Sequence, residues 1–196
     1  IYVVSFSARC SYCHCVFNAM KFESRLNYVG WQGKLQESSL FRRWWQFWSN
    51  YAFIFFAAAG LGLTQQYNGY QILVLSFISF VVARGIVTTL INLGYHRVRP
   101  YQLYKFNPIT SRFFSLQTAK PNSFPSRHTT AFTSVAAVVT MFNPVAGIIL
   151  YGVTVMTGLG RIVLGYHYPT DILGGLTLGT LIGVLTVFIG SILLFT

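Results

Sequence analysis

Long apolar stretches alternate with short polar ones along most of this 196-residue chain. A helix needs about 20 predominantly apolar residues to cross a bilayer. Five stretches meet or approach this requirement, namely residues 44–63, 70–95, 129–142, 145–159 and 172–195. The pattern therefore predicts an all-α fold, a polytopic membrane helix bundle.

The boundaries of these stretches carry the residues expected at membrane surfaces and tight turns. Trp44, Trp45 and Trp48 open the first stretch and form the aromatic belt expected at headgroup level. The Asn143-Pro144 pair is a turn signal between the third and fourth stretches. The last stretch contains small residues that permit close helix packing, namely Gly174, Gly175, Gly179 and Gly183.

The first third of the chain contributes two weaker elements. Residues 1–20 are apolar enough for a further spanning helix, although Arg9 and His14 interrupt them. In residues 34–48, apolar and aromatic residues recur every three to four positions with basic residues between them, which predicts a helix lying in the membrane interface. A solvated loop is the alternative there. The prediction is six transmembrane helices and one interfacial amphipathic helix in a single domain, residues 1–196.

The order of the spans places the polar segments. If the stretch ending near Tyr95 emerges on one face, residues 96–127 lie on that face and the 143–144 turn lies on the opposite one. Residues 160–171 then return to the first face. Counting spans therefore predicts that six polar side chains far apart in sequence converge on one side of the membrane, namely Arg99, Arg127, His128, Arg161, His167 and Asp171.

Composition supports a membrane location and indicates the chemical class of the binding partner. The chain is 54% hydrophobic and 9% charged, whereas a soluble domain has about 25% charged residues. Fourteen Lys and Arg stand against three acids, Glu23, Glu37 and Asp171. A basic excess on so apolar a chain indicates anionic lipid as the partner, and no basic tract with interleaved aromatics supports nucleic acid.

Three cysteines, Cys10, Cys13 and Cys15, flank His14 and superficially resemble metal-ligand spacing. A structural zinc site needs four ligands, and no second Cys/His pair follows at a usable distance. We therefore expect no metal site and no cofactor.

The converging residues match the chemistry of phosphate. Guanidinium groups pair with phosphate oxygens two at a time, and the hydroxyl of Ser126 and the N–H groups of a helix start add donors. Asp171 follows His167 by four residues, so its carboxylate can fix one imidazole nitrogen and leave the other as a nucleophile or base. His128 arrives from another helix and can protonate a leaving oxygen. Each group alone is typical of a membrane edge, but the combination favours phosphoryl transfer.

Three motifs resemble the signatures of the type 2 phosphatidic-acid phosphatase superfamily. They are "RP" at 99–100, "PSRH" at 125–128 and "GRIVLGYHYPTD" at 160–171, against the family pattern K-x6-R-P, P-S-G-H and S-R-x5-H-x3-D. The motifs cover residues 92–171, and the helix layout agrees from residue 44 onward. The resemblance implies a membrane lipid phosphatase similar to bacterial phosphatidylglycerophosphate, undecaprenyl-diphosphate and lipid A phosphatases.

The resemblance also implies a metal-independent mechanism. His167 is expected to attack phosphorus and form a phosphohistidine, oriented by Asp171, and His128 is expected to act as the general acid. The phosphoryl oxygens are expected to be held by Arg99, Arg161 and Ser126, with donors near Arg127.

The chain departs from the family pattern at three positions. Asn92 stands at the family lysine, Arg127 at the glycine of the second motif, and Gly160 at the serine before Arg161. We expect Asn92 to make at most a weak hydrogen bond to phosphate, and Arg127 or Arg97 to offset the missing cation. Some relatives that act on isoprenoid diphosphates also replace this glycine, which gives the hypothesis that Arg127 contacts a second phosphate.

The last expectation from the sequence concerns the side of the membrane on which the site lies. Most basic residues fall on the active-site side, Arg9 and Arg84 excepted, and the positive-inside tendency would place that side in the cytoplasm. Family members instead face the periplasm, lumen or cell exterior, so we expect a bacterial inner-membrane protein with its site on the outer face. Arg84, in mid-helix, is expected to face the bundle interior.

Two alternatives to a lipid phosphatase stay open. One is a lipid-phosphate binder or transporter without catalysis, because Asn92 carries no charge. The other is a phosphotransferase that moves a phosphoryl group between lipids. The apolar spans exclude a soluble haloperoxidase.

Overall fold

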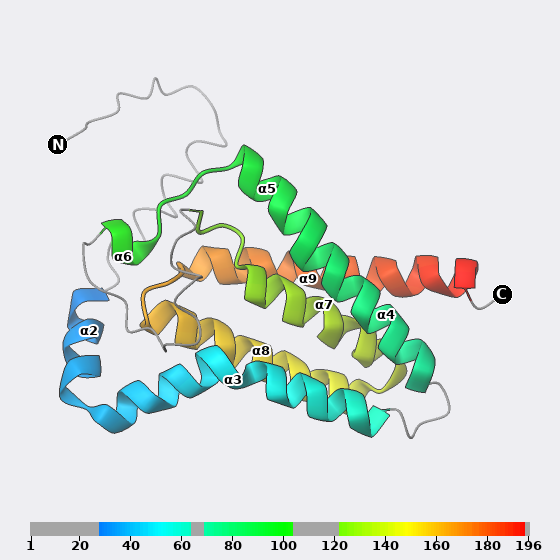
Figure 1. The fold of residues 1–196 in the computed structure, drawn as a ribbon, viewed down its shortest axis with the longest axis horizontal. Helices are drawn as coiled ribbons and strands as arrows, with labels where there is room; N and C mark the ends of the chain where they lie inside the picture. The colour runs from blue at the N-terminus through cyan, green and yellow to red at the C-terminus, as the bar shows by residue number, and fades with distance from the viewer. Residues whose placement is uncertain (1–27, 64–68, 104–121, 195–196) are drawn as a thin grey trace.

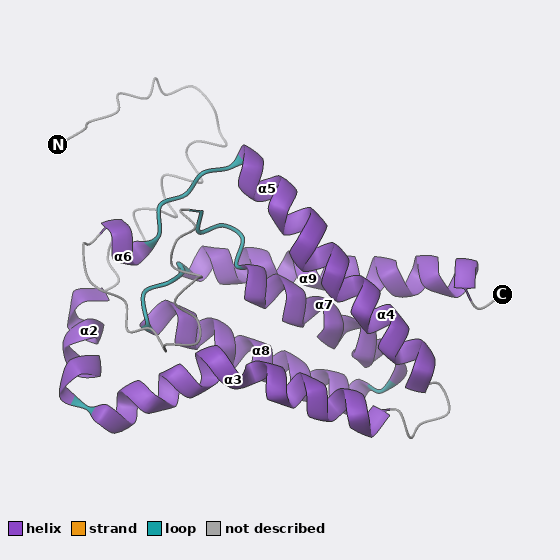
Figure 2. Ribbon diagram, in the orientation of Figure 1, coloured by secondary structure: helices purple, strands orange, loops and turns teal. Residues whose placement is uncertain are grey.

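The computed structural model describes residues 28–63, 69–103 and 122–194, and every regular element in these ranges is a helix (Figures 1 and 2). The elements are α2 (Tyr28–Glu37), α3 (Ser39–Leu63), α4 (Gly69–Val81), the π-helical segment η1 (Val82–Val87), α5 (Thr88–Gly94), α6 (Pro100–Leu103), α7 (Arg127–Phe142), α8 (Pro144–Val163) and α9 (Pro169–Leu194). The all-α prediction is therefore confirmed for the described residues.

Three described helices are long and apolar enough to cross a bilayer, namely Tyr70–Gly94, Pro144–Val163 and Pro169–Leu193. The first of them is the continuous run of α4, η1 and α5. The predicted stretches 44–63 and 129–142 lie in α3 and α7, and α7 has 16 residues. The count of six transmembrane helices stays a prediction, and residues 1–20 lie outside the described part.

The segment predicted as one interfacial helix, residues 34–48, is divided in the structure. Its first residues end α2, and the rest forms the beginning of α3. Ser38 separates the two because its Oγ accepts a hydrogen bond from the N–H of Phe41 (3.3 Å), which caps the start of a new helix. Leu35 of this segment is fully buried and packs with Leu164 and Tyr166, whereas Leu40, Trp44 and Phe47 are exposed.

Helix α7 occupies the centre of the bundle, with α4, α8 and α9 packed around it (Figure 1). One core cluster, Ile72, Ala136, Val139 and Leu150, joins α4, α7 and α8. The face of α7 toward α9 is made of small and hydroxylated residues, and α9 presents Gly179 and Gly183 to it. Small residues at this contact let the two backbones approach closely.

Segments distant in sequence meet at one end of the bundle. The N–H of Tyr101 donates to the carbonyl of Gly165 (3.1 Å), that of Ser123 to Arg97 (2.9 Å), and that of Ser126 to Asp171 (3.2 Å). The turn between α7 and α8 lies at the other end, where Asn143 Oδ1 caps α8 by accepting from the N–H of Ala146 (3.0 Å). The convergence expected from counting spans is therefore observed.

Candidate active site

His167 is held in a tight turn between α8 and α9. The N–H groups of Tyr166 and His167 both donate to the carbonyl of Arg161, at 2.9 and 3.3 Å. Gly165 precedes them with φ 77°, a left-handed conformation that favours glycine. The turn places the imidazole inside the bundle end, where His167 is only 3% exposed.

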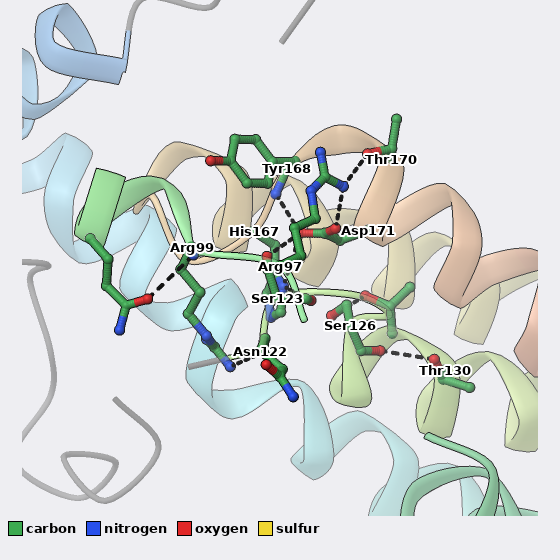
Figure 3. A network of polar contacts seen from close by, with 12 residues as sticks. Arg97, Arg99, Asn122, Ser123, Ser126, Thr130, His167, Tyr168, Thr170 and Asp171 are labelled. Carbon is green, nitrogen blue, oxygen red and sulfur yellow. Dashed lines mark hydrogen bonds and ion pairs between the residues drawn. The ribbon is translucent and has the colours of Figure 1, made fainter. Parts of the chain in front are cut away.

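Two groups face the Nδ1 atom of His167 (Figure 3). The carbonyl oxygen of Ser123 lies 2.9 Å away and Asp171 Oδ2 lies 3.5 Å away. Because a carbonyl oxygen can only accept, Nδ1 carries the proton and Nε2 keeps its lone pair. The sequence predicted Asp171 as the orienting group, and the structure adds the Ser123 carbonyl as the shorter contact.

Asp171 is buried at the centre of a polar network (Figure 3). Its Oδ2 accepts from the N–H of Tyr168 (2.8 Å) and from the hydroxyl of Ser123. Its Oδ1 forms an ion pair with Arg97 Nη1 at 2.7 Å. Three groups thus fix the carboxylate beside His167, and a carboxylate in this place stabilises a positively charged imidazole.

Arg97 is committed to this network rather than open to a ligand. Besides Asp171, its Nη1 donates to Thr170 Oγ1 (2.7 Å), and its guanidinium carbon lies 4.2 Å from the centroid of the Tyr168 ring. Of the two residues expected to offset the missing family lysine, Arg97 is therefore placed to hold Asp171.

The surroundings of His167 favour a neutral ring. Burial lowers the pKa of His167, and the nearby positive charges of Arg99 and Arg161 lower it further, while the contact with Asp171 opposes them. A neutral imidazole with a free Nε2 is the form that can attack phosphorus.

Two buried arginines retain unused donors. Arg99 Nη2 donates to the carbonyl of Asn122 (3.2 Å) and Arg161 Nη2 to that of Ser49 (3.0 Å). The Nε atoms of both arginines are buried without a partner among the described residues. Buried guanidinium groups are costly unless an anion meets them, so both side chains are suited to hold phosphoryl oxygens.

Ser126 stands directly before α7 and is fully buried. Its Oγ accepts a hydrogen bond from Thr129 Oγ1 (3.0 Å), so the proton of its own hydroxyl can be donated elsewhere. The side chain of Ser126 itself makes no capping hydrogen bond to the first turn of α7. The N–H groups of that turn and the Ser126 hydroxyl together form an anion-binding helix start.

The remaining predicted residues lie around this centre in different environments. His128 faces a cavity that Arg84 and Arg161 also line. Arg127 is partly buried, and no hydrogen bond or ion pair of its side chain occurs within the described ranges. Asn92 is buried and donates from Nδ2 to the carbonyl of Thr88 in its own helix.

Sequence reasoning missed several contributors, above all Ser123 and Asn122. Their backbone carbonyls contact His167 and Arg99 respectively, and a backbone carbonyl has no residue signature in the sequence. Ser123 also donates its hydroxyl to Asp171. In the part of the chain that the structure describes, no group of three His, Cys, Asp or Glu side chains could hold a metal ion. The segment with Cys10, Cys13 and Cys15 lies outside that part.

Two of the similar proteins carry phosphatase names and a third is named as a transport protein. The undecaprenyl-diphosphatase BcrC of Bacillus subtilis is 31% identical over 106 residues, covering 53% of this chain and 51% of the relative. A lipid A 1-phosphatase of Rhizobium johnstonii is 28% identical over 109 residues, 56% of this chain and 44% of the relative. The chain thus spans about half the length of these relatives. The bacitracin transport permease protein BcrC of Bacillus licheniformis is 29% identical over 131 residues, 65% of this chain and 62% of the relative.

The fold is shared with a solved structure. The crystal structure of a transmembrane PAP2 type phosphatidylglycerolphosphate phosphatase from Bacillus subtilis matches 93% of this chain and 94% of its own, with a TM-score of 0.53 at 18% identity. A model of the PAP2 superfamily matches residues 73–191. This match spans more than half of the chain and includes all three motifs, so the chain belongs to the PAP2 superfamily.

Proposed function

We propose that this protein is an integral membrane phosphatase that hydrolyses a phosphomonoester or diphosphate of a lipid through a phosphohistidine intermediate. One observation carries the proposal. The ring of His167 is fixed by a donated Nδ1 hydrogen bond, and its pKa is lowered by burial beside Arg99 and Arg161. A buried, neutral histidine among cations is suited to attack a bound phosphate.

The proposed reaction has two steps. Nε2 of His167 bonds to phosphorus while the bond from phosphorus to the lipid oxygen breaks, and that oxygen takes the electron pair and a proton from His128. Arg99, Arg161 and Ser126 hold the phosphoryl oxygens, and Asp171 stabilises the charged imidazole. Water then attacks phosphorus and gives a proton to His128, while the bond between phosphorus and Nε2 of His167 breaks. Inorganic phosphate leaves, and both histidines return to their starting states.

The reaction as proposed needs no metal ion and no cofactor. Protein side chains supply both requirements of phosphoryl transfer, a positioned nucleophile and positive charge around the phosphoryl group. Arg127 adds a further cation at the start of α7, and Asn92 contributes at most one weak hydrogen bond.

The relatives' names support lipids as the substrates. One is named for undecaprenyl diphosphate and another for lipid A, so the substrate class proposed here is a phosphorylated lipid presented at the membrane surface. Localisation in a bacterial inner membrane, with the site on the outer face, is part of the proposal. A lipid-to-lipid phosphotransferase would use the same intermediate with a lipid acceptor in place of water.

A transporter or lipid-phosphate binder is the second candidate, since one relative is named a bacitracin transport permease protein. Catalytic release of phosphate by the purified protein separates the two functions, because a binder or transporter leaves its substrate intact.

The test is phosphate release from a lipid panel by purified protein in a chelator. The panel contains undecaprenyl diphosphate, phosphatidylglycerophosphate, phosphatidate and lipid A. We expect turnover of at least one lipid, its loss in His167→Ala, and its retention in His96→Ala, which removes an exposed histidine near the site. Normal turnover by His167→Ala, or strict dependence on a divalent metal, would refute the mechanism.

A further inference from the structure

A cavity of about 360 Å³ lies beside the catalytic residues, between helices α3, α4, α7 and α8. Half of its lining residues are aromatic or aliphatic, namely Phe53, Phe56, Phe80, Phe132 and Val135. Phe53 is 50% exposed, so the wall reaches the outer surface of the bundle. A cavity of this composition and position fits the beginning of a lipid chain.

The same cavity is also lined by polar groups, which would have no hydrogen-bond partner if only an apolar lipid chain filled it. Arg84, His128, Arg161 and Ser49 also line it. Ser49 Oγ and Arg161 Nε are buried with no hydrogen-bond partner among the residues described, and these two residues are only 3% and 4% exposed. Buried polar atoms without partners are rare, and two of them at one cavity indicate a polar ligand.

Arg84 is the unexplained member of this group. It lies in the π-helical segment η1, ten residues before the end of α5 at Gly94, which is about 15 Å along the helix axis. Its guanidinium makes no hydrogen bond or ion pair within the described part of the chain. π-Helical segments occur frequently at functional sites, and an arginine at this depth is expensive unless it meets an anion.

The surrounding charges cannot neutralise Arg84. Its own helix presents uncharged Thr88 and Asn92 on the buried face, and Arg127 adds positive charge nearby. His128 lies within the electrostatic reach of both Arg84 and Arg161. The cavity is thus an electropositive, largely apolar site without an acid in its lining.

The position of His128 indicates which part of a substrate enters this cavity. In phosphoryl transfer the attacking and leaving atoms lie roughly in line with phosphorus, so a general acid stands on the leaving side, opposite His167. A lipid alcohol leaves as a neutral molecule and needs no cation there. A lipid diphosphate instead releases a lipid monophosphate, which carries one to two negative charges near neutral pH.

We propose that the cavity lined by Arg84, His128 and Ser49 is a subsite for the phosphate that remains on the lipid, with Arg84 as its anchoring cation. This inference rests on the proposed function and narrows it to lipid diphosphates as preferred substrates. The bond between the two phosphates breaks, its bridging oxygen stays on the lipid monophosphate, and Arg84 meets that leaving phosphate. Arg84 is therefore a specificity-determining residue that none of the three motifs contains.

The experiment compares kcat/KM for undecaprenyl diphosphate and undecaprenyl monophosphate, which differ by one phosphoryl group. Arg84→Met keeps a flexible, unbranched side chain, although a shorter one, and removes its charge. We expect the ratio of the two kcat/KM values to fall by about 10- to 100-fold, the loss typical of a charged hydrogen bond. Arg84→Lys should restore part of the ratio, and Arg43→Met, which removes an exposed arginine of α3, should leave it unchanged.

A second measurement does not depend on turnover. Undecaprenyl monophosphate should inhibit the wild-type protein as a product, and its inhibition constant should rise in Arg84→Met by a similar factor. An equal loss on both substrates would assign Arg84 to the reacting phosphate and overturn the proposal, as would an unchanged ratio. Failure of the wild-type protein to release phosphate from any lipid would instead refute the proposed function itself.

Discussion

At the scale of single residues, the carboxylate of Asp171 combines two roles that substitution can separate. It lies 3.5 Å from His167 Nδ1, and it also organises the surrounding chain through Ser123, Tyr168 and Arg97. The charge matters when the imidazole becomes positive on attack, whereas the hydrogen bonds matter in every state. A variant that changes only the charge should therefore affect catalysis more than folding.

Asp171→Asn is expected to lower kcat for phosphate release by about 100-fold or more, because the amide no longer stabilises a charged imidazole. The matched control is Ser123→Ala, which deletes one hydrogen bond to the same carboxylate but keeps the carbonyl that orients His167. It should cost about tenfold or less. Initial rates at saturating lipid, with thermal midpoints for both variants, make the comparison. Equal losses of kcat would mean that the network acts only by maintaining structure.

The sequence identified the side chains of this site but not how they are connected. Spacing alone predicted that His167 and Asp171 lie together, and span counting brought Arg99 and Arg161 to them. Neither method finds the carbonyl of Ser123, because its position depends on the path of the chain before α7. The ion pair of Arg97 with Asp171 was also missed, since a cation near a phosphate site is first expected to bind phosphate.

At the scale of elements, α7 and α9 must stay in close contact because they carry the two halves of the site. Ser126 and His128 stand at the start of α7, and Asp171 stands at the start of α9. Farther along, a Cβ atom on Gly183 of α9 would lie 2.6 Å from the Cβ of Ala137 and also against the Ser134 carbonyl. These neighbours belong to the packed centre of the bundle, so they cannot shift to make room without a loss of stability.

Gly183→Ala is therefore expected to destabilise the protein by about 1–3 kcal/mol, the usual cost of overpacking. Separation of α7 from α9 should also lower phosphate release. Gly152→Ala is the control, because a Cβ atom there meets nothing within 4 Å and alanine favours a helix. Thermal midpoints in the same detergent measure both effects. If the two variants have the same thermal midpoint, the contact between α7 and α9 has room for an extra methyl group.

Element boundaries were predictable where local signals were strong. The Asn143-Pro144 pair marked the turn between α7 and α8, and Asn143 caps α8 as such a residue should. Residues 34–48 were harder, because the pattern typical of an interfacial helix is also produced by a helix end that packs against the bundle. Ser38 divides that segment, and Leu35 is buried against Leu164. The π-helical turn at Arg84 had no sequence signal.

At the scale of the whole molecule, the positive charge gathers at the end of the bundle that holds the site. Arg97, Arg99, Arg127 and Arg161 all lie there. The positive-inside tendency alone would turn this end toward the cytoplasm. Arg97 is, however, paired with Asp171, and Arg99 and Arg161 are buried in the site. Such charges are not the exposed loop charges on which that tendency depends. We therefore expect the site to face the outer side.

Cysteine labelling in intact spheroplasts tests this orientation. In a background with Cys10, Cys13 and Cys15 changed to serine, Leu103→Cys marks α6 at the site end and Val145→Cys marks the opposite end, at positions 57% and 71% exposed. A membrane-impermeant maleimide should label the first variant before permeabilisation and the second only afterwards. Retained phosphate release in both variants shows that the bundle is intact. The reverse labelling pattern would place the site in the cytoplasm, and the lipid would then have to be dephosphorylated in the inner leaflet.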